Sequence, residues 1–402
     1  MKMIDGGVCA AKGFKAGAIH AGIRRKKGKS DLAMICSDVI CSAAGVFTRN
    51  KVKASPILLD LEHLKNGQAQ AIICNSGNAN ACAPFGMENA RRQAKAAARA
   101  LGIAEENVLV SSTGVIGQTL NVQAIEDHAA DIEMKYDNSE AAAVAIMTTD
   151  TKPKSCAVEF EAGGKTCRIG GICKGSDMIH INMGTMLCFI TTDCAISAEM
   201  LHKALKENVR TTVNRVSVDG DTSTNDSCMI LANGLAGNAC IESEGADFDT
   251  FSAALHEILV DLAKKIAGDG EGCTRLMTVN VSGVSDEDKA ETLAMSICSS
   301  SLTKAAMFGA DANWGRVLCA MGYSGADFDP EKVNVAFASK VGTIAVCENG
   351  RGLDFDEDLA KKILSEDSVE INVTMDEGDA SVTCWGCDLT YDYVKINGDY
   401  RT

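Results

Sequence analysis

The alternation of hydrophobic and polar residues along the chain predicts both strands and helices. Short apolar segments bounded by Gly, Asn, Asp or Ser are typical of strands. Such segments occupy residues 30–50, 54–60, 69–75 and 107–112, and three more lie between 155 and 195. Helical periodicity is clearest over 87–101, an Ala- and Arg-rich segment followed by Gly102 as its stop signal.

Further helices are expected at regular intervals towards the C-terminus. They are predicted over 122–134, 197–210, 250–267, 285–299, 301–308 and 357–364. From about residue 277 the chain alternates short strands with helices, so the predicted fold class is mixed α/β. The acid-rich segment GVSDEDKAE marks a change of composition near 280. We therefore expect a main domain over residues 1–280 and a smaller α/β domain over 281–402.

Composition and charge narrow the class of protein. The 402 residues are enough for two or three domains at about 150 residues each. With 39 basic against 54 acidic side chains the formal net charge is −15, which argues against a nucleic acid or an anionic membrane as partner. No long apolar segment follows the N-terminal charges, and none reaches the length of a membrane span. The expected location is therefore the cytoplasm.

The 18 cysteines are expected to be small buried hydrophobes rather than disulfide or metal partners. Cys36, Cys74 and Cys319 each lie in an apolar stretch. The single CxxC pair, Cys384 and Cys387, has no second pair to complete a zinc site, and the alternation around it predicts a strand. The six histidines show no ligand spacing, so no metal is predicted.

Four segments rich in Gly, Thr, Asn and Asp lie beside apolar strands. They are NSGNANAC (75–82), SSTGVIG (111–117), KGSDMIHINMGTM (174–186) and DGDTSTND (219–226). Each alone is explained by turn chemistry, because these residue types dominate turns. Four together favour a polar, backbone-lined pocket at the ends of strands. The last begins like a calcium loop, but Thr224 and Ile230 replace its required Gly and Glu.

A hydroxyl nucleophile in these segments would need a base, and no nucleotide-binding loop or GxSxG elbow offers another chemistry. A threonine that becomes N-terminal after chain cleavage carries its own base, the α-amine. Gly184–Thr185 suits such a cut sterically, because a small, permissive residue precedes the hydroxyl. A threonine that simply begins a strand is the competing interpretation.

The segment KGSDMIHINMGTMLCFITTD resembles the self-processing region of the ornithine acetyltransferase/glutamate N-acetyltransferase family (ArgJ), where KGSGMI-x-PNMATML is typical. The resemblance continues in order through AIICNSGNANAC, SSTGVIG, MTTDTKPK, SVDGDTSTNDSCMILANG, DGEGCTRL and the C-terminal DLTYDYVKINGDYRT. It implies a layered αββα sandwich of the ornithine acetyltransferase/aminopeptidase type with a smaller C-terminal domain. Self-cleavage would give an alpha chain of residues 1–184 and a beta chain of residues 185–402.

The resemblance also implies a reaction. Thr185 would take the acetyl group of N2-acetyl-L-ornithine and pass it to L-glutamate, a ping-pong reaction of arginine biosynthesis. Thr113 and Gly114 would form the oxyanion hole. Together with Thr185, the residues implied to bind substrate are Thr151, Lys174, Glu271, Asn397 and Thr402, the last two being brought back to the active site by the C-terminus. By charge, Glu271 suits the cationic end of the substrate and Lys174 an anionic end.

The resemblance implies small-molecule substrates, a heterotetramer of two alpha and two beta chains, and no cofactor. Some members also accept acetyl-CoA as acetyl donor, and no residue of this chain decides that point. Near the cut the chain departs from the family pattern at Asp177, His180 and Gly184. His180 is either a proton donor in cleavage or an ordinary loop residue. Two other functions stay open: a self-processed N-terminal nucleophile hydrolase or aminopeptidase, and an unprocessed binding protein.

Overall fold

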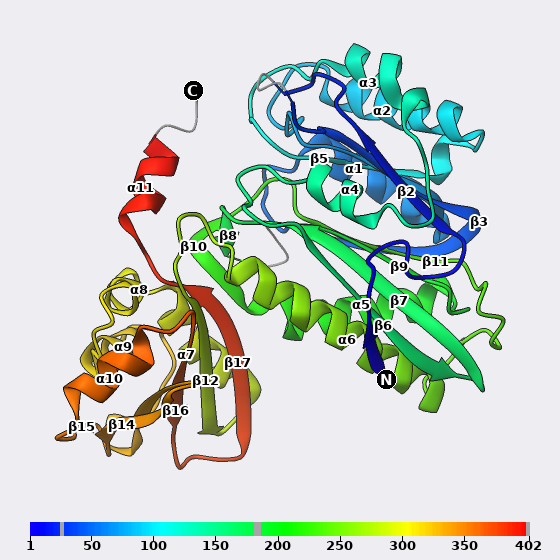
Figure 1. Ribbon diagram of the computed structural model, residues 1–402. Coiled ribbons are helices and arrows are strands. Elements are labelled where there is room, and N and C mark those ends of the chain that lie inside the picture. The colour runs from blue at the N-terminus through cyan, green and yellow to red at the C-terminus, as the bar shows by residue number, and fades with distance from the viewer. Residues whose placement is uncertain (25–27, 181–185, 399–402) are drawn as a thin grey trace. The chain divides into compact units, whose positions relative to one another are not determined.

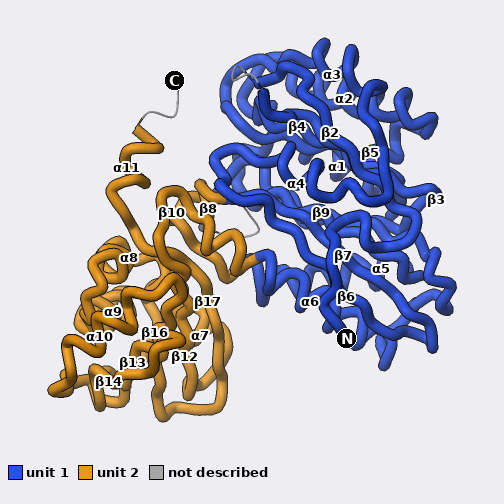
Figure 2. The backbone as a smooth tube through the Cα atoms, viewed as in Figure 1, with its two compact units in different colours: residues 1–175, 182–214, 222–262 blue, residues 176–181, 215–221, 263–402 orange. Residues whose placement is uncertain are grey.

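The computed structural model describes residues 1–24, 28–180 and 186–398, and it divides into two compact units (Figure 2). Unit 1 comprises residues 1–175, 182–214 and 222–262, and unit 2 comprises residues 176–181, 215–221 and 263–402. Gly184, Thr185 and Thr402, three of the predicted site residues, lie outside the described residues. Each unit combines one sheet with helices (Figure 1), so the predicted mixed α/β class is confirmed.

Unit 1 is built on a nine-stranded sheet. Its strands, in spatial order, are β1 (Lys2–Ile4), β6 (Lys154–Ala162), β7 (Lys165–Lys174), β9 (Leu187–Thr192), β11 (Ser227–Ala232), β3 (Leu32–Phe47), β4 (Gln68–Asn75) and β5 (Val108–Ser112), with β2 (Phe14–Ile19) also paired to β3. The 16-residue β3 pairs with β2 through residues 32–37 and with β11 through residues 42–47. It therefore joins the two halves of the sheet.

Both faces of the central strands are buried. Alternate side chains of β3 and β4, such as Leu32 and Ile73, pack with α1 (Ser55–His63) and α2 (Gly86–Leu101). The intervening side chains share a second core with β7, β9, β11 and α4 (Ser139–Ala145). This explains the continuous apolar runs. Successive side chains of a strand point to opposite faces of the sheet, and here each face packs into a different hydrophobic core.

The other half of the unit 1 sheet is covered by α6 (Ala246–Ala267), whose Leu262 lies against Gly171 of β7. Helices α1 and α2 thus cover one part of the unit 1 sheet and α6 another. The remaining helices of this unit are α3 (Val122–His128) and α5 (Ala198–Thr211).

Unit 2 has an eight-stranded sheet. Its spatial order is β15 (Arg351–Gly352), β14 (Gly342–Glu348), β13 (Asn334–Ser339), β16 (Ser368–Thr374), β12 (Leu276–Val284), β17 (Ala380–Cys387), β10 (Val216–Thr222) and β8 (Ile179–His180). The helices are α7 (Glu287–Ser299), α8 (Ser301–Phe308), α9 (Trp314–Gly322), α10 (Glu357–Leu364) and α11 (Tyr391–Gly398). Cys384 and Cys387 lie in β17, as their alternation predicts.

The domain boundary expected near residue 280 is wrong, because residue 280 lies inside β12, a central strand of the unit 2 sheet. The boundary falls after Leu262, within α6, and two short earlier segments, residues 176–181 and 215–221, also belong to unit 2. The acid-rich segment marks the turn from β12 into α7, where Asp286 caps the helix.

Two local predictions are also wrong. Residues 54–60 form the start of α1 instead of a strand, because Pro56 occupies its first turn and has no amide to contribute to a sheet. Cys319 is exposed on α9, whose buried positions are Val317, Ala320 and Met321. No helix among the described residues combines the length and apolar character needed to cross a bilayer.

Candidate active site

The described candidate residues fall into two groups, one in each unit. Unit 1 holds Thr113, Gly114, Thr151 and Lys174. Unit 2 holds Glu271 and Asn397.

The turn at Thr113 and Gly114 follows the buried strand β5. The amide of Thr113 donates to the carbonyl of Asn75 (2.9 Å), so the turn lies against the end of β4. Gly114 has φ of +125°, and a Cβ there would lie 2.8 Å from the carbonyl carbon of Gly77. Glycine is required on both counts, since the conformation and the close approach exclude a side chain.

Side-chain amides hold this turn in place. Asn75 Nδ2 donates to Ser112 Oγ (2.7 Å), while Asn75 Oδ1 accepts from the amide of Asn78 (3.1 Å). Asn225 Nδ2 donates to the carbonyls of Ala79 (2.6 Å) and Ser112 (2.8 Å). Three of the four polar segments found in the sequence therefore meet around the turn, which favours the pocket interpretation over isolated turn chemistry.

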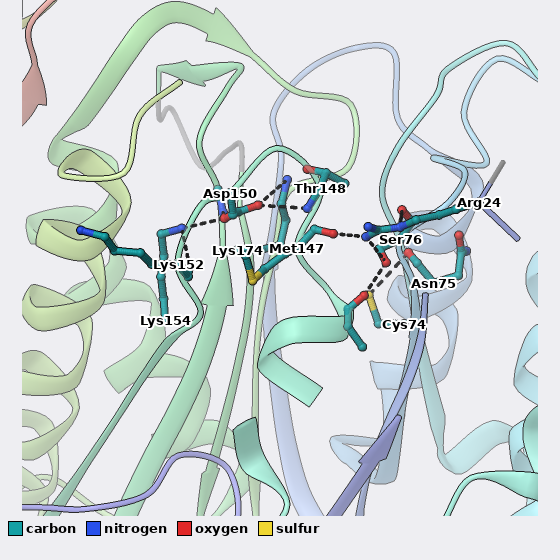
Figure 3. Close-up of polar contacts among 12 residues, drawn as sticks. Arg24, Cys74, Asn75, Ser76, Met147, Thr148, Asp150, Lys152, Lys154 and Lys174 are labelled. Carbon is teal, nitrogen blue, oxygen red and sulfur yellow. Dashed lines mark hydrogen bonds and ion pairs between the residues drawn. The ribbon is translucent and has the colours of Figure 1, made fainter. Parts of the chain in front are cut away.

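Asp150, Lys154 and Lys174 form a second feature of unit 1, here called the cationic cluster (Figure 3). Lys154 Nζ lies 2.7 Å from Asp150 Oδ1, and Lys174 Nζ lies 3.9 Å from Asp150 Oδ2. All three residues are buried, with Lys174 only 6% exposed. Burial of Asp150 disfavours its charge, but the two lysines outweigh this effect and lower its pKa to about 2. The aspartate is therefore ionised at neutral pH.

Lys174 is the least tightly held member of the cationic cluster. A separation of 3.9 Å is an ionic contact rather than a hydrogen bond. Burying an ammonium is costly unless it is paired. In the described structure this pairing is the contact with Asp150, and the expected role of Lys174 as partner of an anionic ligand group stays a prediction. Thr151, next to Asp150, is exposed.

Unit 2 contains an acidic cluster, comprising Asp177, Asp219, Asp221 and Glu271 around Tyr393. Burial raises the pKa of the Tyr393 phenol, and the four carboxylates raise it further. Glu271 is buried, and its Oε2 accepts from Asn397 Nδ2 (2.6 Å), so two of the predicted substrate residues meet.

Asp219 connects the acidic cluster to the chain that leads to the predicted cleavage site. Its carboxylate accepts from the amides of Met178 (2.6 Å) and Ile179 (2.8 Å). Burial raises the pKa of Asp219, and the charge of Asp177 adds to this effect. His180, one of the departures from the family pattern, lies in strand β8.

Sequence reasoning missed Arg24, which joins two loops of unit 1. Its Nε donates to the carbonyl of Ser76 (2.8 Å) and its Nη2 to Ser76 Oγ (2.6 Å) and to the carbonyl of Met147. Asp150 and Lys154 were also missed as partners of Lys174. The only signal was their i, i+4 spacing, which does not reveal burial. Among the described residues no group of His, Cys, Asp and Glu is arranged to hold a metal ion.

Comparison with known proteins identifies the family. The sequence model of the ArgJ family matches residues 15–402. The arginine biosynthesis bifunctional protein ArgJ of Caldanaerobacter subterraneus subsp. tengcongensis is 48% identical, with the whole of both chains covered. ArgJ 1 of Clostridium acetobutylicum is 50% identical over 97% of this chain and 96% of its own. The glutamate N-acetyltransferase of Methanocaldococcus jannaschii is 46% identical, again over the whole of both chains. The chain therefore belongs to the ArgJ family.

Proposed function

We propose that this protein is a self-processing acyltransferase of arginine biosynthesis that moves the acetyl group of N2-acetyl-L-ornithine to L-glutamate. The observation that carries the proposal is the family match over residues 15–402, with relatives named bifunctional ArgJ and glutamate N-acetyltransferase. The features that support it among the described residues are the turn at Thr113 and Gly114 and the buried charges of Lys174 and Glu271.

In the proposed reaction the chain first cleaves itself between Gly184 and Thr185. The freed α-amine of Thr185 accepts the proton of its own hydroxyl, which attacks the acetyl carbonyl of N-acetylornithine. Ornithine leaves with that proton, and the α-amine of glutamate then attacks the acetyl-threonine ester. Thr113 and Gly114 stabilise the oxyanion of each tetrahedral intermediate, a role in which one lost donor typically costs about 10²–10³ in kcat.

Substrate recognition follows from charge. In this proposal Lys174 binds the substrate carboxylate, and Glu271 binds the δ-ammonium of the ornithine moiety. Asn397 orients Glu271 through the 2.6 Å hydrogen bond to its carboxylate. Thr151 and Thr402 complete the set of polar contacts. No cofactor takes part, and acetyl-CoA is a second acetyl donor to be tested directly.

The alternative is a self-processed hydrolase or aminopeptidase in which water takes the place of glutamate. The family match favours the transferase, because a relative that is 46% identical over the whole of both chains is named glutamate N-acetyltransferase. The test is to incubate the protein with N-acetylornithine with and without glutamate. The transferase releases ornithine in multiple turnovers only when glutamate is present. Turnover that is independent of glutamate would establish the hydrolase.

We also propose that the processed enzyme is a cytoplasmic heterotetramer of two alpha and two beta chains. Light scattering after size exclusion measures the mass of the assembly, and denaturing electrophoresis of the same fraction separates the two chains. An undivided full-length chain in that fraction would favour the unprocessed binding protein.

A further inference from the structure

Asp150 lies at the junction of three segments of unit 1. It lies in the loop 146–153 between α4 and β6, close to the start of β6 at Lys154 and the end of β7 at Lys174. Strands β6 and β7 pair with Lys154 opposite Cys173, so both lysines lie at the open end of this hairpin. The segment that runs towards Thr185 leaves from the same end.

Four groups converge on the Asp150 carboxylate (Figure 3). Oδ1 accepts from Lys154 Nζ (2.7 Å) and from the amide of Gly175 (2.8 Å). Oδ2 accepts from the amide of Thr148 (3.1 Å) and faces Lys174 Nζ (3.9 Å). A single carboxylate therefore fixes both the side chain of Lys174 and the backbone immediately after it.

The contacts of Asp150 exceed what local structure requires. Closing its own loop uses the bonds from Thr148 and Lys154. The bond from Gly175 and the contact with Lys174 span 25 and 24 residues, and they join this loop to the segment that carries the substrate lysine. An ionised carboxylate also holds an ammonium more strongly than a neutral amide does.

We propose that Asp150 is a positioning residue for acetyl transfer, holding the Lys174 ammonium, and the backbone at Gly175 beside it, in the geometry in which Lys174 receives the substrate carboxylate. This inference rests on the proposed function, since Lys174 is given its ligand there. Asp150 itself touches no reacting atom. Its loss is therefore expected to weaken binding of both substrates more than it slows the chemical step.

The test compares Asp150→Asn with wild type in steady-state assays of acetyl transfer. The variant keeps the size of the side chain but places an NH2 group where one carboxylate oxygen accepted. We expect KM for N-acetylornithine and for glutamate to rise about tenfold, while kcat changes by less than about threefold. An unchanged KM for both substrates would overturn the proposal.

Asp60→Asn is the matched control. Asp60 is also fully buried in unit 1, but its partner is the amide of Val110 (2.7 Å) and no lysine is paired with it in the described structure. Its substitution is expected to leave both KM values unchanged. Equal KM increases in the two variants would assign the effect to general disturbance of the core and overturn the proposal.

A second variant covers the case in which Asp150→Asn does not fold. Asp150→Glu retains the charge but moves the carboxylate by one methylene. If Asp150 positions Lys174, this variant should show raised KM values for both substrates, and circular dichroism checks that it is folded. Wild-type KM values would show that the charge alone suffices and would refute the positioning role. The wild-type assay separates a failure of this inference from a failure of the proposed function. A wild-type protein that does not transfer acetyl to glutamate refutes the proposed function, whatever the Asp150 variants show.

Discussion

The pKa values of buried carboxyl groups shift in opposite directions in the cationic cluster of unit 1 and in the acidic cluster of unit 2. In the first, two lysines lie against one aspartate, whose pKa falls to about 2. In the second, carboxylates gather, and the pKa values of Asp219 and Tyr393 rise. The comparison teaches that the charge beside a buried carboxyl decides whether its pKa falls or rises. Under the proposed assignment of Lys174 and Glu271 to groups of opposite charge, it also predicts which variants affect which substrate.

The largest effect is expected from removing the cation. Lys174→Met preserves the apolar stem and removes the ammonium, so both substrates lose the partner of their carboxylate. A buried charge-assisted contact is worth about 2–3 kcal/mol, which corresponds to a rise of about 100-fold in KM for N-acetylornithine and for glutamate. Steady-state kinetics measure this. A rise for only one substrate would contradict a shared carboxylate contact.

A smaller and more selective effect is expected in the acidic cluster. Glu271→Gln removes one negative charge, while its amide oxygen still accepts from Asn397 Nδ2. Because only the ornithine moiety carries a δ-ammonium, KM for N-acetylornithine is expected to rise about tenfold, and KM for glutamate less. The ratio of the two KM values is the measurement. If KM for glutamate rises more than KM for N-acetylornithine, the proposed assignment of Glu271 to the δ-ammonium is wrong.

The smallest effect contrasts Asp150 with Asp60, a buried carboxyl whose pKa is not lowered by any lysine of the described structure. Burial raises the pKa of Asp60 well above its ordinary value. Its ionisation in the unfolded chain therefore opposes folding above the unfolded pKa, and this penalty disappears below it. Asp60→Asn removes the penalty but buries an NH2 group, so we expect a net stabilisation of about 1 kcal/mol at pH 7.

Denaturant unfolding at two pH values checks this prediction. The stabilisation by Asp60→Asn should be absent at pH 4. The sign is opposite for Asp150, because its depressed pKa contributes stability that is present above the unfolded pKa and lost as the pH falls towards 2. Asp150→Asn should therefore destabilise the protein at pH 7. Stabilisation by both variants at pH 7 would remove the distinction between the two aspartates.

Much of the fold could be predicted from periodicity, but polar partnerships could not. The apolar runs at 30–50 and 69–75 identify β3 and β4 because both faces of these strands are buried. The helix at 87–101 was visible through its Ala content and its Gly102 stop. The apolar run at 54–60 was predicted to be a strand because hydrophobicity alone does not distinguish a short strand from a helix. Pro56 lies in the first turn of the observed helix α1, a position that favours a helix over a strand.

The candidate site shows the same limit. The four polar segments were recognisable from composition, and family resemblance added roles for Thr113, Lys174 and Glu271. The contacts of Arg24 with Met147 join residues 123 positions apart, so no local pattern reports them. The partnership of Asp150 with Lys174 likewise depends on how β6 and β7 pair. The cleavage site itself, Gly184–Thr185, stays a prediction.

Intact mass spectrometry tests the central claim most directly. The purified protein should give two chains with the masses of residues 1–184 and 185–402, whereas Thr185→Ala should give one uncut chain. After incubation with N-acetylornithine, the chain beginning at Thr185 should gain the mass of one acetyl group and lose it when glutamate is added. A single uncut wild-type chain, or an acetyl group on the other chain, would contradict the account.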